Sequence, residues 1–322
     1  MKENNLNDIK LRWYQKIALE SLWCFSRMAH YSPRWFRFKV LQPFIYLILR
    51  LVRYRSKVIL ENLFASFPEK SDKEIYTLAN KYYYFLAEIM VNTISLAGVS
   101  YKRDADILRW KNYEEHLKRV ADTDWIGSGA HFGCWEYLPS WAWYIPDTTF
   151  LSVYHPLSSP VFECFFRRLR NFAPNIAQVP MRNAVLYYLQ NRKKKRIMLG
   201  LISDQSPALR PDTEWIKFLN QDTAFIDGSE KLALKFHLPI YFAYIKRLAA
   251  GRYEAEWIQL YDGYEEVAPN EITRRYAAIL EKMILEVPEL WMWSHRRWKH
   301  TPKKQEALFG TAKEKLQKTK QQ

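Results

Sequence analysis

His131 and Glu136 are the two residues whose types and spacing best suit them for chemistry. They lie five positions apart in the segment Gly129–Glu136, which reads Gly-Ala-His-Phe-Gly-Cys-Trp-Glu. On one ideal helix their side chains would diverge by about 140°, but a histidine in a turn can meet a carboxylate from the first turn of the next helix. A carboxylate that fixes one imidazole nitrogen leaves the other free to take a proton. The spacing therefore predicts that His131 is a general base and that Glu136 orients it.

Two alternatives to this dyad follow from the same segment. A histidine and a glutamate at this spacing also occur by chance, although the glycines at positions 129 and 133 favour catalysis because they let a substrate approach the backbone closely. Cys134 lies three residues from the histidine. A thiol beside a base could instead be a nucleophile that forms a covalent intermediate.

The segments around the dyad predict an α/β fold. A short buried strand precedes His131, and Cys134–Tyr144 reads as a helix after it. Helical patterns alternate with β-rich runs, which indicates a sheet with helices on its faces. The predicted strands are Trp125–Ser128, Thr149–Val153, Ile197–Ile202, Pro239–Ile245 and Glu254–Leu260. Upstream, a short helix is predicted over Lys57–Phe67, and Ser71 with Glu74 forms a capping box for a long helix from Asp72 towards Leu96.

The N-terminal 56 residues predict a helical membrane anchor. Leu11–Ala29 confines its charged residues to one narrow helical stripe, and Val40–Leu49 carries no charge. Arg50, Arg53, Arg55 and Lys57 follow, a cluster suited to anionic headgroups. Together these features are typical of a segment that lies on a bilayer. Two core helices of a soluble protein are the alternative.

Composition points in the same direction. The chain has 322 residues and a formal net charge of +15, which implies an anionic partner. Its 13 Trp, 21 Tyr and 18 Phe favour a membrane interface over nucleic acid. Cys24, Cys134 and Cys164 show no metal-binding or disulfide spacing, and neither a phosphate loop nor a zinc motif is present. We therefore predict no metal and no cofactor, and the three cysteines fit the cytoplasm.

We expect three regions along the chain. Residues 1–56 form the anchor, residues 57–300 the α/β domain, and residues 301–322 a polar, lysine-rich tail whose end is mobile or weakly helical. The basic run Asn191–Arg196 is either a solvated helix end or a surface that attracts an acidic partner.

Several blocks of sequence resemble the bacterial lipid A biosynthesis acyltransferases, the late lauroyl and myristoyl transferases, in that family's order. The first block, Arg53–Pro68, resembles the segment after the family's anchor, and His131–Glu136 resembles its His-x4-Glu/Asp motif. The remaining blocks are Tyr154–Pro156, Arg167–Arg170, Asp204-Gln205 and Pro288–Lys299. Two positions depart from the pattern, because Cys134 stands where the family usually has Asn and Asn220 where it usually has Gly. Either departure could alter the preferred acceptor or chain length.

The resemblance implies a glycerolipid-acyltransferase-like fold and direct acyl transfer. The donor would be an acyl-acyl carrier protein, and the acceptor a hydroxyl of a lipid A precursor. His131 would take the hydroxyl proton, an effect worth roughly 10² to 10⁴ in rate, and Glu136 would stabilise the imidazolium. The enzyme would work at the cytoplasmic face of the inner membrane, against an anionic lipid surface.

Further residues receive roles by position and type. Arg170, with Arg168 as second choice, is a candidate for stabilising the oxyanion or for binding an acceptor phosphate. Asp204 and Gln205 follow the strand-like run Ile197–Ser203, where α/β sheets build sites. Both either support the catalytic groups or position the acceptor, and Asp204 is alternatively a helix N-cap or a loop acid. The cluster His295, Arg296 and Arg297 either binds a phosphate or forms an exposed cationic face.

Three other functions remain as alternatives. An acyltransferase of the same fold could act on an aminolipid or a glycolipid. A nucleic-acid-binding protein would account for the +15 charge, but it would need exposed aromatic side chains among the basic residues. A non-catalytic membrane scaffold would not need the intact pair His131 and Glu136.

Overall fold

A seven-stranded mixed sheet forms the centre of the molecule. The structure, a computed structural model, describes residues 9–310. The strand order is β1-β9-β8-β2-β5-β3-β4, and neighbouring strands are parallel except β8 and β9, which form an antiparallel hairpin. The strands span Leu108–Trp110 (β1), Trp125–Gly129 (β2), Thr149–Tyr154 (β3), Ile176–Pro180 (β4), Ile197–Ile202 (β5), Ile240–Ala249 (β8) and Arg252–Tyr261 (β9).

The predicted α/β class and all five predicted strands are confirmed. The sequence prediction missed β1 and β4 at the two edges of the sheet, and a separate hairpin of β6 (Ile216–Phe218) and β7 (Gln221–Thr223). Each of these strands has three to five residues, which is too short for an alternating pattern to stand out.

The central strand β2 is buried along its whole length. A Cβ at Gly127 would lie 2.1 Å from Cε of Met198 and 3.0 Å from the Trp257 ring, so glycine lets these two side chains pack closely over the strand. Gly129 of β2 pairs with Ile202 of β5. His131 and Asp204 follow these two parallel strands, so both residues lie at the same end of the sheet, where β2 and β5 have their C-termini.

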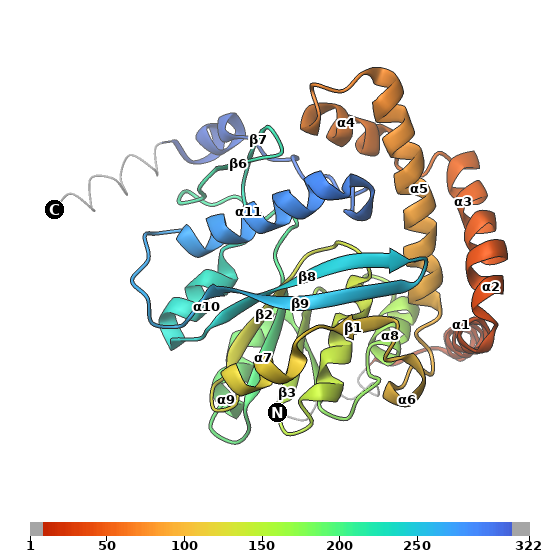
Figure 1. Cartoon of the computed structure of the whole chain (residues 1–322), viewed down its shortest axis with the longest axis horizontal. Coiled ribbons are helices and arrows are strands. Elements are labelled where there is room, and N and C mark those ends of the chain that lie inside the picture. Colours follow the sequence, from red (N-terminus) through yellow and green to blue (C-terminus); the bar gives the residue numbers. More distant parts are fainter. Residues whose placement is uncertain (1–8, 311–322) are drawn as a thin grey trace.

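Helices cover both faces of the sheet (Figure 1). The helices predicted over Lys57–Phe67 and from Asp72 towards Leu96 are present as α4 (Ser56–Ser66) and α5 (Asp72–Ile94). The capping box of Ser71 and Glu74 begins α5. The others discussed below are α8 (Pro160–Leu169), α9 (Ala184–Asn191) and α11 (Glu271–Glu286), of which α11 runs beside β8 and β9. The segment after His131 is a 3-10 helix, Trp135–Tyr144, that contains Pro139. Proline has no N–H to donate in an α-helix.

The N-terminal helices pack against the rest of the fold. They are α1 (Trp13–Tyr31), α2 (Arg34–Phe36), the π-helical turn Arg37–Leu41 and α3 (Gln42–Leu51). Ser26 donates a hydrogen bond to the carbonyl of Ile94, His30 Nδ1 lies 2.9 Å from the carbonyl oxygen of Ser95, and Gln42 donates to the carbonyl of Tyr84 at 3.0 Å. The outward faces of these helices nevertheless expose apolar side chains, including Trp13, Trp35, Phe44, Leu47 and Leu51. Within residues 9–310, no helix combines the length and apolar character needed to cross a bilayer.

Many of the aromatic residues that suggested a membrane interface are instead in the core. Trp110, Trp125, Trp141 and Trp257 pack together with ring centroids 4.7–6.3 Å apart. Aromatic count alone was therefore a weak indicator, because large rings also fill the interior of a sheet protein.

The predicted C-terminal tail begins as an ordered helix. Residues 302–310 are helical, and Gln305 is buried, where its carboxamide accepts from the Trp215 indole at 2.7 Å and donates to the carbonyl of Arg210 at 2.9 Å. The prediction of a mobile or weakly helical end concerns residues 311–322, which lie outside the described residues.

Candidate active site

His131 and Asp204 form the centre of the site. The turn after β2 brings His131 to the end of β5, where Nδ1 of the imidazole lies 2.7 Å from Oδ1 of Asp204. The backbone N–H of His131 also donates to Oδ2 of the same carboxylate at 2.9 Å. Two contacts from one residue to one carboxylate fix both the ring and the backbone of the turn.

Trp291 completes the surroundings of Asp204. Its indole N–H donates to Oδ2 at 2.9 Å, and its backbone pairs with that of Phe132. The Asp204 side chain is only 2% exposed. Burial alone would raise the pKa of this carboxyl, but the charge of His131 and the hydrogen bonds from His131 and Trp291 hold it below its usual range. Asp204 is therefore an ionised, buried carboxylate at neutral pH.

The same contacts favour the imidazolium form of His131. Burial lowers the pKa of the imidazole, but the charge and hydrogen bond of Asp204, together with the charge of Glu136, raise it above its usual range. When His131 is neutral, the ionised carboxylate keeps the proton on Nδ1. Nε2 is then the basic nitrogen of the site.

The predicted contact between Glu136 and the imidazole is wrong, because Asp204 makes it. Glu136 instead accepts two hydrogen bonds from Arg170, from Nε at 2.8 Å and from the terminal nitrogen at 2.7 Å. The 3-10 helix that starts at Trp135 brings Glu136 to the C-terminal end of α8, where Arg170 lies. A bidentate guanidinium compensates a buried carboxylate better than one imidazole N–H does.

The pair of Glu136 and Arg170 is tightly coupled. Burial would raise the pKa of Glu136, but the charge and hydrogen bonds of Arg170 keep it below its usual range. Burial disfavours the Arg170 cation, yet Glu136 raises its pKa above the usual range. Glu136 therefore acts on His131 through its charge and fixes Arg170 through direct hydrogen bonds.

The other predicted arginine, Arg168, lies away from this centre. It donates to Glu20 of α1 at 2.8 Å, and its guanidinium lies 4.0 Å from the centroid of the Trp23 ring. These contacts join α8 to α1. Arg168 has a structural role in this arrangement.

Gln205 covers the basic nitrogen of His131. Its side-chain nitrogen lies 3.3 Å from Nε2 of the imidazole, a contact in which the carboxamide can donate to the ring. A substrate hydroxyl that gives its proton to Nε2 must take the place of this contact. Gln205 therefore occupies the position next to the basic nitrogen of the site.

The cluster His295, Arg296 and Arg297 is divided by the structure. His295 Nε2 accepts a hydrogen bond from the backbone N–H of Ser206 at 3.3 Å, and burial lowers its pKa to about 4. Arg297 is buried, donates to the carbonyl of Ala224 at 2.7 Å and has its pKa lowered by burial to about 10. Arg296 is exposed. His295 therefore supports the loop after β5 and Arg297 the segment after β7, and the three residues do not form one exposed phosphate site.

Cys134 does not have the properties of a nucleophile. The side chain is buried, and burial raises the pKa of its thiol well above the usual range. The thiolate that attacks a carbonyl is therefore disfavoured at this position.

The basic run Asn191–Arg196 lies far from His131. It directly precedes β5, whereas Asp204 and Gln205 follow that strand. A strand of six residues spans roughly 20 Å. The run therefore lies near the N-terminal end of β5, whereas the site lies at the C-terminal end.

The sequence prediction missed Trp291 as a member of the site. The residue stands in the C-terminal block Pro288–Lys299, which the sequence analysis singled out, but nothing in that block indicates an indole directed at Asp204. In residues 9–310, no cluster of histidine, cysteine and acidic side chains could hold a metal ion.

Comparisons with known proteins identify the family of the chain. Among solved structures, the 1-acyl-sn-glycerophosphate (LPA) acyltransferase PlsC from Thermotoga maritima is similar at 14% identity and a TM-score of 0.34, over 86% of this chain and 99% of that chain. No curated protein sequence matches the chain. A family model described as bacterial lipid A biosynthesis acyltransferase matches residues 21–300. Because this match covers more than half of the chain, the chain belongs to the bacterial lipid A biosynthesis acyltransferase family and is an acyltransferase that acts on lipid.

Proposed function

We propose that the protein transfers a fatty acyl chain from acyl-acyl carrier protein to a hydroxyl of a lipid A precursor, with His131 as general base and Asp204 as its orienting carboxylate. The observation that carries this proposal is the 2.7 Å contact between His131 Nδ1 and Asp204 Oδ1, which turns Nε2 towards Gln205. The His131 side chain is 19% exposed, so a substrate can reach it.

The reaction proceeds by direct transfer. The hydroxyl oxygen of the acceptor forms a bond with the thioester carbonyl carbon while its proton moves to Nε2 of His131. The tetrahedral intermediate then breaks the carbon–sulfur bond, and the proton on His131 passes to the departing thiolate. Asp204 stays ionised throughout and stabilises the imidazolium, as the acid does in a catalytic triad.

Arg170 is the cation that this mechanism places beside the base. Glu136 uses two of its N–H groups, and a guanidinium has five. The remaining groups can donate to the oxyanion of the tetrahedral intermediate or to a phosphate of the acceptor. The charge of Glu136 also favours the imidazolium that forms during the reaction.

A bilayer surface supplies the acceptor in this proposal. The exposed apolar side chains of α1 to α3, with the arginines that follow α3, suit the cytoplasmic face of an inner membrane with anionic lipids. The apolar faces of these helices supply binding that does not depend on charge.

The test is a reconstituted transfer with purified components. Acyl-acyl carrier protein, a lipid A precursor in mixed micelles and the enzyme are incubated, and the products are measured by lipid mass spectrometry. We expect one added acyl chain with the wild type and none with His131→Ala at an unchanged thermal melt. The lipids of a deletion strain identify the natural acceptor, and normal acylation of lipid A in that strain would contradict the proposed substrate.

A further inference from the structure

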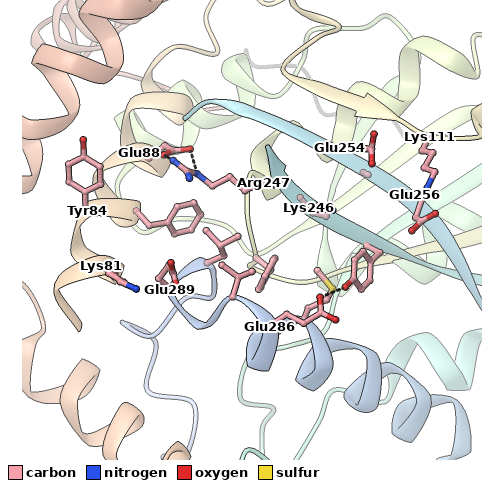
Figure 2. Close-up of a pocket in the computed structure, with 18 of the residues that line it drawn as sticks. Lys81, Tyr84, Glu88, Lys111, Lys246, Arg247, Glu254, Glu256, Glu286 and Glu289 are labelled. Atoms are coloured by element: carbon pink, nitrogen blue, oxygen red, sulfur yellow. Dashed lines mark hydrogen bonds and ion pairs between the residues drawn. The ribbon is translucent and has the colours of Figure 1, made fainter. Parts of the chain in front are cut away.

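A cavity lies between α5, α11 and the β8–β9 hairpin, next to the residue that follows His131 (Figure 2). Its volume is about 750 Å³, and His131, Glu136 and Asp204 do not line it. Cavities of roughly 300–1,000 Å³ hold small molecules in proteins. The size therefore suits one small ligand.

The floor of this cavity is apolar. Phe85 of α5, Ile245 of β8 and Met283 of α11 meet Phe132 and Leu290 there. All five side chains are buried by the fold. Phe132 directly follows His131, and Leu290 directly precedes Trp291, so the floor is formed by the back of the catalytic loop. A surface of this kind suits an alkyl chain.

The rim of the cavity carries charges of both signs. Lys81, Lys111 and Lys246 provide cations, and Glu254, Glu256 and Glu289 provide anions. Within residues 9–310, none of these six side chains forms an ion pair with another side chain. Arg247 and Glu88 at the same cavity form an ion pair at 2.6 Å. The six side chains of the rim are therefore the charges that a ligand can pair with.

Tyrosines complete the rim. Tyr46 of α3 and Tyr84 of α5 meet edge to face, with ring centroids 5.6 Å apart, and Tyr244 of β8 donates to Glu286 at 2.6 Å. Aromatic faces attract quaternary ammonium groups, and the carboxylates of the rim add to this attraction. The rim therefore offers binding groups for an ammonium as well as for a phosphate.

We propose that this cavity binds a single-chain zwitterionic amphiphile, with its alkyl chain on the apolar floor and a phosphate and a quaternary ammonium at the charged rim. Tyr46 belongs to α3, whose Phe44 and Leu47 are exposed, so the cavity borders the surface that we assign to the membrane. The inference rests on the proposed function only in taking the membrane as the source of the ligand. The site is separate from the acyl-transfer centre at His131.

Native mass spectrometry of the full chain tests this binding. The protein carries His131→Ala to prevent turnover and is released from a neutral maltoside detergent. The three probes share a dodecyl chain: dodecylphosphocholine, dodecyl phosphate and dodecyltrimethylammonium. We expect one dodecylphosphocholine per chain, and about fivefold weaker binding of each probe that lacks one charge. Equal binding of all three probes would overturn the proposal, because it would indicate an unspecific apolar surface.

Charge reversals at the rim locate the site. Lys111→Glu with Lys246→Glu is expected to weaken dodecylphosphocholine and dodecyl phosphate but not dodecyltrimethylammonium. Lys73→Glu with Lys282→Glu is the matched control, since these exposed lysines lie on α5 and α11 outside the cavity. Equal effects of the two pairs would contradict the assignment. The experiment measures binding in an inactive variant. Its outcome therefore does not depend on whether the wild type transfers acyl chains.

Discussion

Oδ1 of Asp204 lies 2.7 Å from Nδ1 of His131 although 73 positions separate the two residues in the chain. The parallel pairing of β2 and β5 creates this contact, because both residues follow their strands at one edge of the sheet. The carboxylate that orients the base thus follows a different strand, β5. Glu136, the carboxylate nearer in sequence, accepts hydrogen bonds from Arg170 instead.

Asp204→Asn is expected to lower the turnover number on the order of 10³-fold to 10⁴-fold, because an amide no longer fixes the imidazole with its proton on Nδ1. The measurement is acyl transfer from acyl-acyl carrier protein at saturating acceptor. Asp222→Asn is the matched control, because this exposed carboxylate of β7 pairs with Lys217 and not with the site. A loss of only a few-fold in Asp204→Asn, with an unchanged melt, would return the orienting role to Glu136.

Glu136 and Arg170 should couple strongly in a double-mutant cycle. Glu136→Gln alone leaves the guanidinium with a weaker partner, and we expect it to reduce the free energy of unfolding by about 2 kcal/mol. Arg170→Met alone should cost at least as much, since it leaves a buried carboxylate without its cation. The double variant should lose less than the sum of the two single losses, as measured by chemical denaturation. Additive losses would mean that the pair contributes no interaction energy.

The rate of acyl transfer should rise with pH through a pKa above 6.5, the usual value for histidine, because only neutral His131 accepts a proton and its pKa is raised. Glu136→Gln removes a negative charge that favours the imidazolium, so the rising limb should shift to lower pH. A pH–rate profile of both enzymes checks this. A profile that does not move would show that the charge of Glu136 does not reach His131.

The free energy of unfolding should fall as the pH rises through the pKa of His131, whereas the rate of acyl transfer should rise. The raised pKa of His131 contributes stability that is present below 6.5 and is lost as the pH rises through the folded value. The lowered pKa of Asp204 contributes stability that is present above 3.8 and is lost as the pH falls through its folded value. The pair therefore stabilises the fold most where His131 is charged, and activity increases as that contribution declines.

Trp291→Phe should lower the turnover number about tenfold, because Asp204 loses one of its hydrogen bonds and holds the imidazole less firmly. The rising limb of the pH–rate profile should also move, since the indole N–H helps to keep the carboxylate ionised. Trp293→Phe is the matched control, because its indole donates to the carbonyl of Pro288 and not to the site. If Trp291→Phe lowered only the melting temperature and left the pH–rate profile unchanged, the role of Trp291 would be packing alone.

The sequence predicted the elements of the site better than its contacts. The buried strand before His131 and the strand before Asp204 were both recognised, because apolar runs and capping residues are local signals. The pairing of β2 with β5 is not local, and therefore the partner of the imidazole could not be read from the spacing of His131 and Glu136. The indole of Trp291 could not be placed for the same reason, and the short edge strands carry too few residues for a periodic pattern.

The outward face of α3 is expected to bind the bilayer. Deletion of the N-terminal segment is a poor test, because Gln42 and His30 are buried against α5 and its end, and their removal would expose the core. Replacing Phe44, Leu47, Ile48 and Leu51 with Asn changes only exposed positions. This variant should lose most of its sedimentation with anionic vesicles at high salt, where apolar contacts supply the binding.

The control for this variant changes exposed apolar residues elsewhere. Val185, Leu186 and Leu189 on α9 are exposed to a similar degree, and their replacement with Asn should leave sedimentation unchanged. A loss of binding in the α9 variant, with none in the α3 variant, would transfer the membrane surface to α9. Equal partial losses in both would indicate that the chain adsorbs to vesicles through scattered apolar residues, in place of a defined anchor.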